Sequence, residues 1–419
     1  MRRKLPLLMV LATIGAVVPA SAGNARPGGL LQASTSSGPS VGRQVAIVPE
    51  CSNKKDDDGD GLVDMADPGC TGPLDNDEYN SPPPGGGGGF FAVSDPFQTS
   101  LPNAHDLGAM THGHVRWVHT GLFWPQIEPR RGLFNWSRSD KIIGDLASRG
   151  IHVLPYVYAT ARYVAKNPYK PPLRSKRARR AWQTFLRTLA NRYGPGGKYW
   201  SNPALYRLHH PGAAPVPITY WQIWTEPNLT KYFLPRPSPR RYAKLVRISH
   251  EAIRAADPHA KVILAGLPAY AKSTAWGFLN RLYKTKGIKH SFEGVAVHPY
   301  AASVRLQARA LKRTRKVIKH RHDAHTPIWI TELGWGSNPP DRFHLNKGLH
   351  GQARYLKKSF RMVLRHRRSW NVKRVFWFRW RDLPAGSKCY GSIACSGGLF
   401  TASGHPKPAW RAFKHFAHR

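Results

Sequence analysis

Residues 218–228 read ITYWQIWTEPN, and residues 326–335 read TPIWITELGW. Each stretch contains a short run of isoleucine, tryptophan and tyrosine that closes on a glutamate, Glu226 in the first and Glu332 in the second. A continuous apolar run of this length is typical of a strand buried on both faces, as in a parallel sheet covered by helices. The two stretches therefore predict buried parallel strands that end on carboxylates.

Similar strand-like runs alternate with helical patterns from residue 90 to residue 419. Eight strands, each followed by a helix, predict an α/β fold of the (β/α)8 TIM-barrel type. A doubly wound open sheet is the alternative, but it needs a glycine-rich phosphate turn after an early strand, and the sequence has none. The predicted strands are residues 90–93, 115–118, 151–157, 218–224, 261–265, 294–297, 328–331 and 375–380.

Glu226 and Glu332 then end the fourth and seventh strands, where a TIM barrel carries its functional groups. Only five glutamates occur in residues 90–419, and the other three fall in a loop, within a helix and before a strand. Two carboxyl groups about 5–5.5 Å apart suit a retaining glycosidase, in which one is protonated and the other attacks the anomeric carbon. Trp124 and Trp380 lie near strand ends and offer flat faces for sugar rings.

Seven motifs in this order resemble clan A of the glycoside hydrolases, the superfamily with catalytic carboxylates on strands four and seven. The nearest members are the family 39-like and family 5-like enzymes of secreted bacterial type. The resemblance covers most of residues 90–419, and its motifs are VRWVHTGLFWPQIEPRRGLFNWS, GIHVLPYVY, YWQIWTEPN, GVAVHPYA, PIWITELGWGS, VFWFRWRD and GLFTASGHPKPAW. It implies a secreted retaining O-glycosidase that acts on a polysaccharide or oligosaccharide and needs no cofactor for catalysis.

Residue by residue, the resemblance implies that Glu226 is the acid/base and Glu332 the nucleophile. His298 and Tyr300 resemble the groups after strand six that hydrogen-bond the nucleophile or the sugar. Trp380 resembles the tryptophan that stacks under the sugar being cleaved. A histidine satisfied within the core is the alternative reading of His298.

Two positions depart from the family pattern. Thr225 stands where the family usually has the asparagine that donates to the sugar's 2-hydroxyl, and a threonine hydroxyl lacks that reach. His119 aligns with an arginine that holds the nucleophile ionised, with Arg116 three positions earlier, and a histidine charges only partially at neutral pH. These departures leave open a catalytically degenerate barrel that only binds carbohydrate.

The N-terminal residues predict export. Residues 1–22 have the basic start, the apolar run and the small-residue cleavage pattern of a signal peptide, and the apolar run is shorter than a membrane span. Residues 23–45 read as a disordered low-complexity segment, 46–80 as a small acidic module and 81–89 as a proline/glycine linker to the catalytic domain, 90–419. We therefore expect a secreted protein, or one retained at the cell envelope.

The acidic module resembles a short calcium-binding aspartate loop clamped by Cys51 and Cys70. Its aspartates follow the alternate spacing of calcium ligands, but the EF-hand glutamate is missing, and a solvated acidic loop is the alternative. Cys389 and Cys395 flank a second short loop, and four cysteines allow three pairings, of which local pairing is the simplest. The predicted ligands are Asp56, Asp58, Asp60, Asp64 and Asp67.

The formal net charge is +41, and the surplus lies almost entirely in the barrel. Such a charge favours anionic partners, so a cationic protein that binds the envelope or an anionic polymer is a further alternative. The chain has no recognised nucleic-acid motif, and we expect a monomer without a transmembrane segment. An anionic glycan is the expected substrate if basic residues line the barrel mouth: Arg162, Lys166, Lys170, Arg174, Lys231 and Arg236.

Overall fold

The computed structural model describes residues 48–55, 63–66, 70, 72–74, 89–94, 97, 100–270, 274–339, 343–387, 389 and 393–418. The chain divides into two compact units with a boundary between Asn80 and Ser81, and each unit is described by itself. Within the described residues, no helix is both long enough and apolar enough to cross a membrane.

Both disulfides join cysteines that are neighbours in sequence. Cys51 pairs with Cys70 in the N-terminal unit, and Cys389 pairs with Cys395 in the larger unit. Of the three pairings that four cysteines allow, the structure has the local one. All four cysteines belong to the described part of the chain, and none of them is free.

Only part of the predicted calcium loop is described. The short 3-10 turn η1 (Glu50–Ser52) precedes the loop, and a second turn, η2 (Asp64–Ala66), lies within it. Both oxygens of the Asp64 carboxylate accept from the amide of Lys54, at 3.0 and 3.1 Å. Asp56, Asp58, Asp60 and Asp67 lie outside the described residues, as do residues 1–47 and 81–88. Calcium binding, the signal peptide, the low-complexity segment and the linker therefore stay predictions.

The larger unit is built on one sheet of nine parallel strands. The order across the sheet is β5-β4-β3-β2-β1-β9-β8-β7-β6, so the first and last strands of the chain are neighbours. The strands are β1 (Phe91–Ser94), β2 (Trp117–Phe123), β3 (His152–Tyr158), β4 (Tyr220–Ile223), β5 (Lys261–Leu264), β6 (Leu267–Pro268), β7 (Val295–His298), β8 (Ile328–Leu333) and β9 (Val372–Phe378).

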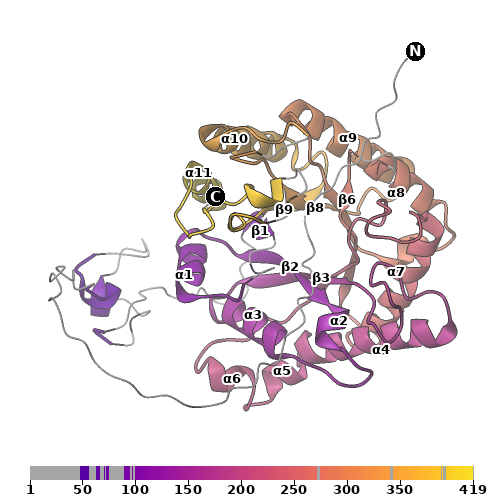
Figure 1. The fold of residues 1–419 in the computed structure, drawn as a ribbon, viewed down its shortest axis with the longest axis horizontal. Helices are drawn as coiled ribbons and strands as arrows, with labels where there is room; N and C mark the ends of the chain where they lie inside the picture. The colour runs from indigo at the N-terminus through magenta and orange to yellow at the C-terminus, as the bar shows by residue number, and fades with distance from the viewer. Residues whose placement is uncertain are drawn as a thin grey trace, which may run out of the picture. The chain divides into compact units, whose positions relative to one another are not determined.

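The two edges of this sheet are consecutive in the chain. Only Ala265 and Gly266 separate β5 from β6. Ile263 of β5 forms a parallel bridge with Gly294, directly before β7, and β6 pairs with β7 in parallel. The sheet therefore curls round on itself, with helices on its outer side (Figure 1). The predicted α/β fold of TIM-barrel type is confirmed.

Side chains from seven strands fill the middle of the sheet. Large indole rings meet small side chains there, and the rings of Trp117 and Trp329 lie 6.2 Å apart in a T-shaped contact. Interlocking of large and small residues is how a small barrel fills its interior, so this is a packed core rather than a channel. The buried cluster is Ala92, Trp117, Leu154, Ile263, Ala296, Trp329 and Phe376.

The longer helices bury one apolar face against the sheet, and several of them begin at a capping residue. Ser175, Ser238 and Ser303 accept from the backbone amide three residues on, at the starts of α4, α7 and α9. The helices are α1 (Ala104–His112), α2 (Trp124–Ile127), α3 (Ser137–Ser148), α4 (Lys176–Tyr193), α5 (Lys198–Ser201), α6 (Tyr206–His209), α7 (Pro239–Arg254), α8 (Ala275–Tyr283), α9 (Val304–His320), α10 (Leu349–His366) and α11 (Pro408–Ala417), with 3-10 turns η3 (Ile288–Ser291) and η4 (Ile393–Cys395).

All eight predicted strands are present, but their ends differ from the prediction. β2 continues to Phe123, five residues beyond the predicted end, and β9 ends at Phe378, two residues before it. The apolar run of the last strand continues to Trp380, yet these later residues pack outside the sheet. An apolar run therefore located the strand without locating its end.

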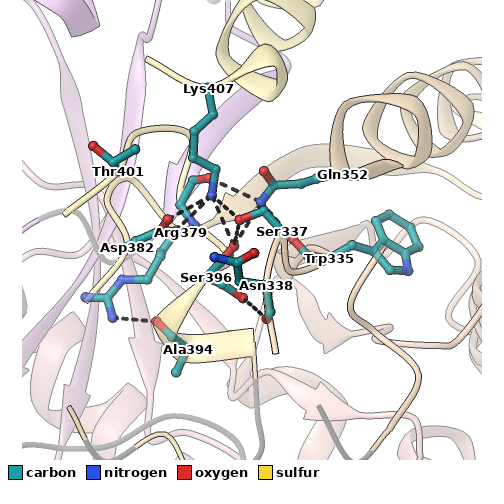
Figure 2. A network of polar contacts seen from close by, with 12 residues as sticks. Trp335, Ser337, Asn338, Gln352, Arg379, Asp382, Ala394, Ser396, Thr401 and Lys407 are labelled. Atoms are coloured by element: carbon teal, nitrogen blue, oxygen red, sulfur yellow. Dashed lines mark hydrogen bonds and ion pairs between the residues drawn. The ribbon is translucent and has the colours of Figure 1, made fainter. Parts of the chain in front are cut away.

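A buried network of polar groups fixes the loops that follow β8 and β9 (Figure 2). The ammonium group of Lys407 donates to Ser337 Oγ at 2.9 Å, to both carboxylate oxygens of Asp382 at 3.0 Å and to the carbonyl of Ser396 at 3.1 Å. The side-chain amide of Gln352 donates to the same carbonyl at 3.2 Å. These bonds tie α10 and the start of α11 to the C-terminal ends of two strands.

Candidate active site

The turn after β4 has an unusual backbone. β4 ends at Ile223, and both Trp224 and Glu226 have positive φ angles, 70° and 43°. L residues rarely adopt such angles, and positions of this kind cluster at functional sites. The amide of Glu226 donates to the carbonyl of Gly266 at 3.2 Å, which holds the turn against the break between β5 and β6. The Glu226 carboxyl group thus lies at the end of the fourth strand.

Glu332 lies within β8 and is held by a tyrosine from the neighbouring strand end. The hydroxyl of Tyr300, two residues beyond β7, donates to Glu332 Oε2 at 3.0 Å. The side chains of Glu226 and Glu332 are only 5% and 11% exposed. Two carboxyl groups that are far apart in sequence are therefore buried together at the strand ends.

His298, the last residue of β7, lies between the two carboxyl groups. Its Nδ1 is 2.9 Å from Glu226 Oε1 and 3.5 Å from Glu332 Oε2, and its Nε2 is 3.2 Å from Thr331 Oγ1. One nitrogen of His298 and one oxygen of each glutamate all lie within 4.8 Å of one another. The structure therefore brings Glu226, Glu332, His298 and Tyr300 together, as the motif resemblance implies.

Gly266 makes room for this histidine. A Cβ atom on residue 266 would lie 1.9 Å from Nε2 of His298, so no other residue fits without moving the imidazole. The same glycine interrupts the fifth strand and accepts from the amide of Glu226. Gly266 thus helps to position both His298 and Glu226, and no sequence motif had marked it as a site residue.

Burial sets the protonation of these groups. Removal from water raises the pKa of Glu226 to about 8, while the ammonium group of Lys231 opposes the shift. Burial likewise lowers the pKa of His298, with Glu332 acting in the opposite direction. At neutral pH, Glu226 therefore carries a proton and His298 is uncharged, so Glu226 is equipped to donate a proton.

Buried tyrosines surround the two carboxyl groups. Burial and the neighbouring glutamate raise the pKa of Tyr158, Tyr232 and Tyr270 well above the usual value for tyrosine. In the described part of the chain, the hydroxyls of Tyr158 and Tyr270 and the second carboxyl oxygen of Glu226 are buried without a hydrogen-bond partner. Unsatisfied buried polar atoms are rare in folded proteins, and these three belong to groups that lie close enough to interact electrostatically around Glu226. They are the groups a polar ligand would satisfy.

The two residues that depart from the family pattern are both buried. Thr225 is 8% exposed and directly precedes Glu226. His119 lies within β2, where its Nδ1 is 3.0 Å from Ser94 Oγ and its ring contacts Tyr156. Burial lowers the pKa of His119 well below its usual value, with His298 as the next contribution. His119 is therefore neutral at physiological pH, whereas the sequence suggested a partially charged side chain.

The structure places Phe378, rather than Trp380, beside the site. The Phe378 ring lies 6.2 Å from that of Tyr300, at a right angle to it. The indole of Trp380 instead donates to Asp106 at 2.8 Å and packs against Trp410 of α11. The difference arises because β9 ends two residues earlier than the apolar run suggested.

Trp124 belongs to the core between α2 and α4. Its indole nitrogen donates to Glu128 at 2.7 Å, and its ring packs on Trp182 and Phe185. Glu128 also accepts from the amide of Gly132, so both of its carboxylate oxygens are bound within the fold. The ring of Trp124 is fully buried, so it offers no open face to a ligand.

Two further features bear on ligands. Glu226, His298 and Glu332 offer the oxygen and nitrogen atoms that a divalent cation binds, in addition to their hydrogen bonds with one another. The basic side chains of the loops after β3 and β4 are all exposed, as the expectation of an anionic substrate requires. These side chains are Arg162, Lys166, Lys170, Arg174, Lys231 and Arg236.

The fold and the paired carboxyl groups after β4 and within β8 define a TIM-type barrel with its polar centre at the strand ends. Because β5 and β6 form one interrupted barrel strand, β4 and β8 are the fourth and seventh strands of the barrel. Structural comparison finds such barrels among glycoside hydrolases. A family 39 glycoside hydrolase from Bacteroides cellulosilyticus superposes with a TM-score of 0.59 at 18% identity, covering 78% of this chain and 63% of that protein. The chain thus spans less than two thirds of that relative.

Two other solved structures are similar to this chain to about the same degree. A family 39 β-xylosidase from Caulobacter crescentus has a TM-score of 0.59 at 15% identity, covering 78% of this chain and 71% of that one. A subfamily 18 member of family 5 from Bifidobacterium longum, in complex with Manβ1-4GlcNAc, has a TM-score of 0.57 at 14% identity, covering 78% and 77%. No protein-family model and no curated sequence matches the chain. The resemblance to families 39 and 5 is confirmed at the level of the fold.

Proposed function

We propose that this chain hydrolyses O-glycosidic bonds in a polysaccharide or oligosaccharide and retains the configuration of the anomeric carbon. The observation that carries this is the buried trio at the strand ends, in which oxygens of Glu226 and Glu332 lie within 4.8 Å of each other. Retaining enzymes place their carboxyl groups about 5–5.5 Å apart, whereas inverting enzymes need about 6.5–9.5 Å to admit a water molecule.

Glu226 acts as the acid/base and Glu332 as the nucleophile. Protonated Glu226 gives its proton to the glycosidic oxygen while the bond from that oxygen to C1 breaks, and a Glu332 oxygen forms an ester with C1. Glu226, now ionised, takes a proton from water, and the resulting hydroxyl bonds to C1 as the ester breaks. The two steps restore both side chains and consume one water molecule.

The neighbouring donors support this division of roles. The Tyr300 hydroxyl donates to Glu332 at 3.0 Å and thereby stabilises an ionised carboxylate, which a nucleophile requires. Burial raises the pKa of Glu226 to about 8, which a general acid requires. Environments that push two carboxyl groups apart in this way identify the acid and the base. This chemistry needs no cofactor.

Trapping of the covalent intermediate tests the proposal. The protein is incubated with a panel of aryl 2-deoxy-2-fluoro glycosides, digested, and the labelled peptide is mapped by mass spectrometry. We expect the label on Glu332 and none in a Glu332→Gln variant. A label on another residue would reject the assignment of the nucleophile, and the sugar that reacts fastest identifies the sugar class.

A barrel that only binds carbohydrate is the second candidate. Thr225 cannot supply the amide donor usual at this position, and the uncharged His119 cannot replace an arginine. Turnover of any glycan by the purified protein, lost in both Glu226→Gln and Glu332→Gln, excludes this candidate. Binding of the same glycan without turnover would favour it.

The exposed basic side chains around the mouth favour a glycan that carries carboxylate or phosphate groups. We propose such an anionic substrate on the strength of Arg162, Lys166 and Lys170, which all extend into solvent after β3. Cleavage of polygalacturonate in preference to neutral mannan or xylan tests this. Equal or better cleavage of a neutral polymer contradicts it.

We also propose that the protein is exported and retained at the cell envelope. The disulfides Cys51–Cys70 and Cys389–Cys395 support it, since such bonds persist in oxidising compartments. The mass of the mature protein in the culture medium measures removal of residues 1–22. We also propose that the acidic module binds calcium, which calorimetric titration of the apo protein with CaCl2 checks.

A further inference from the structure

A groove runs along the outer wall of the larger unit between α10 and α11, and its volume is about 710 Å³. Figure 1 shows the two helices side by side. We call it the α10–α11 groove and define it by the cationic residues along its walls. These are Arg354, Lys357, Lys358 and Arg361 of α10 and Arg411 of α11.

Small residues form the floor of this groove. Ala353, Pro408 and Ala412 line it between the two rows of long side chains. Beneath the floor the helices are joined by aromatic contacts, with the Phe360 ring 6.1 Å from Phe413 and 5.5 Å from Phe416. The hollow is therefore a fixed part of the fold, formed because small side chains lie between packed helices.

The charge of the groove is not neutralised. Among the described residues, none of the five cationic side chains forms an ion pair with an acidic side chain. Asp382 is the last acidic residue of the chain, and its carboxylate is bound by the buried Lys407 at 3.0 Å. Five like charges along one hollow repel one another, so the fold itself gains nothing from them.

We propose that the α10–α11 groove binds a linear anionic polysaccharide, at a site separate from Glu226 and Glu332. The wall from residue 350 to residue 361 of α10 is about 16 Å long, at about 1.5 Å per helical residue. Acidic groups spaced along such a chain would face successive cations. The outer wall would then hold the polymer while the strand ends act on it.

A polysaccharide fits this groove better than a single-stranded nucleic acid. No phenylalanine, tyrosine or tryptophan lines it, whereas single-stranded nucleic acids are bound by stacking bases on such rings. The choice of a polysaccharide rests on the function proposed for the strand-end site. The cationic site itself rests only on the lining residues and their charge.

The test compares two variants that lose the same charges. The groove variant carries Arg354→Gln, Lys357→Gln, Lys358→Gln and Arg361→Gln. The matched variant carries four changes of the same kinds in exposed residues of α9, namely Arg305→Gln, Arg309→Gln, Lys312→Gln and Lys316→Gln. Both are made in the Glu332→Gln background so that no probe is cleaved, and thermal unfolding checks that both fold.

Binding is measured against polygalacturonate, a phosphorylated mannan and double-stranded DNA over a range of NaCl concentrations. We expect the groove variant to bind at least one of the two acidic polymers about tenfold or more weakly, with a shallower salt dependence. The α9 variant should stay within about threefold of the parent. The polymer whose binding is weakened in the groove variant shows whether the groove recognises carboxylate groups or phosphate groups.

Three outcomes overturn the proposal. Equal loss in both variants would mean that total charge, not the groove, attracts polymers. No loss in the groove variant would remove the site. Tighter binding of DNA than of either polysaccharide, lost in the groove variant, would assign the groove to nucleic acid. None of these outcomes changes the trapping result at Glu332, so the two proposals fail independently.

Discussion

Two buried polar clusters lie beyond the ends of different strands of the sheet, and their central charged groups are paired in opposite ways. Around Lys407, the ammonium group makes four short contacts with Ser337, Asp382 and Ser396. Around Glu226, a carboxyl oxygen and nearby tyrosine hydroxyls are buried without partners in the described part of the chain. The ammonium group at the centre of the first cluster has its partners within the protein, although Gln352 Oε1 at the edge of that cluster has none among the described residues. The second cluster leaves the carboxyl oxygen at its centre free to bind a ligand.

The difference separates structure from function. A satisfied network in a low-dielectric interior rigidifies the loops it joins, and breaking it costs folding free energy. An unsatisfied cluster costs folding free energy as it stands and persists where chemistry requires it. Substitutions in the first cluster should therefore affect stability, and substitutions in the second should affect activity.

The largest expected effect is at the nucleophile. Glu332→Gln should lower kcat/KM for an aryl glycoside by about a thousandfold or more, because the covalent step loses its carboxylate. Its melting temperature should stay equal to or above that of the parent, since a buried charge is removed. The control is Glu251→Gln in α7, an exposed glutamate that should leave both quantities unchanged. If Glu332→Gln lowered stability and kept full activity, the Glu226 cluster would be structural rather than functional.

The next effect is at the satisfied cluster. Lys407→Met leaves the largely buried Asp382 without its cation and should lower the free energy of unfolding by about 3 kcal/mol, measured by urea denaturation. The exposed Lys373 of β9 provides the control, Lys373→Met, which should change stability by about 0.5 kcal/mol or less. Adding Asp382→Leu to Lys407→Met should recover most of the loss. A neutral Lys407→Met would show that the network is dispensable.

A smaller effect, at Gly266, should change both stability and activity. Gly266→Ala introduces a methyl group into the space of His298 and should lower stability by about 1–3 kcal/mol. Because His298 lies between the two carboxyl groups, kcat should also fall by about tenfold or more. Gly108→Ala in α1 is the control, since nothing lies within 4 Å of its added Cβ atom. Unchanged kinetics would show that the imidazole position is not needed.

The smallest effect is the pH response of Glu226, whose pKa burial raises to about 8. The protonated acid is lost above that pH, so kcat/KM should fall about tenfold per pH unit there. The raised pKa also makes the folded state bind the proton more tightly. Its stabilising contribution is complete in acid and is lost as the pH rises through about 8. Glu226→Gln should flatten the melting temperature between pH 5 and pH 9, and an unchanged slope would contradict the assignment.

The sequence predicted the parts of the fold and site that depend on local patterns. Buried apolar runs located all eight strands, and a carboxylate at the end of such a run located Glu226 and Glu332. His298 and Tyr300 came from the resemblance to clan A, whose pattern has such groups after the sixth strand of the barrel, which is β7 here. These positions are set by strand order, and strand order is readable in a barrel because each strand is followed by its helix.

The rest depends on contacts that no local pattern records. Trp380 and Phe378 lie in one apolar run, and only the end of β9 decides which ring reaches the site. Gly266 is one glycine among many until its neighbour His298 is placed. The loss of charge at His119 comes from burial by other strands. For Gly266, the sequence did contain one signal. The run LAGLP at residues 264–268 has a glycine that interrupts an otherwise regular strand.

Because of the cationic residues along α10, the free energy of unfolding of this protein should depend on the salt and the polyanions in the surrounding solution. Arg354 and Lys358 lie four residues apart on one helix, as do Lys357 and Arg361, and such pairs of like charge each destabilise a helix by about 0.2–0.5 kcal/mol. Salt screens this repulsion, and a bound polyanion removes it and adds its own binding free energy by mass action. The folded state should therefore be least stable when the protein is free in dilute solution, and most stable where acidic polymer is concentrated.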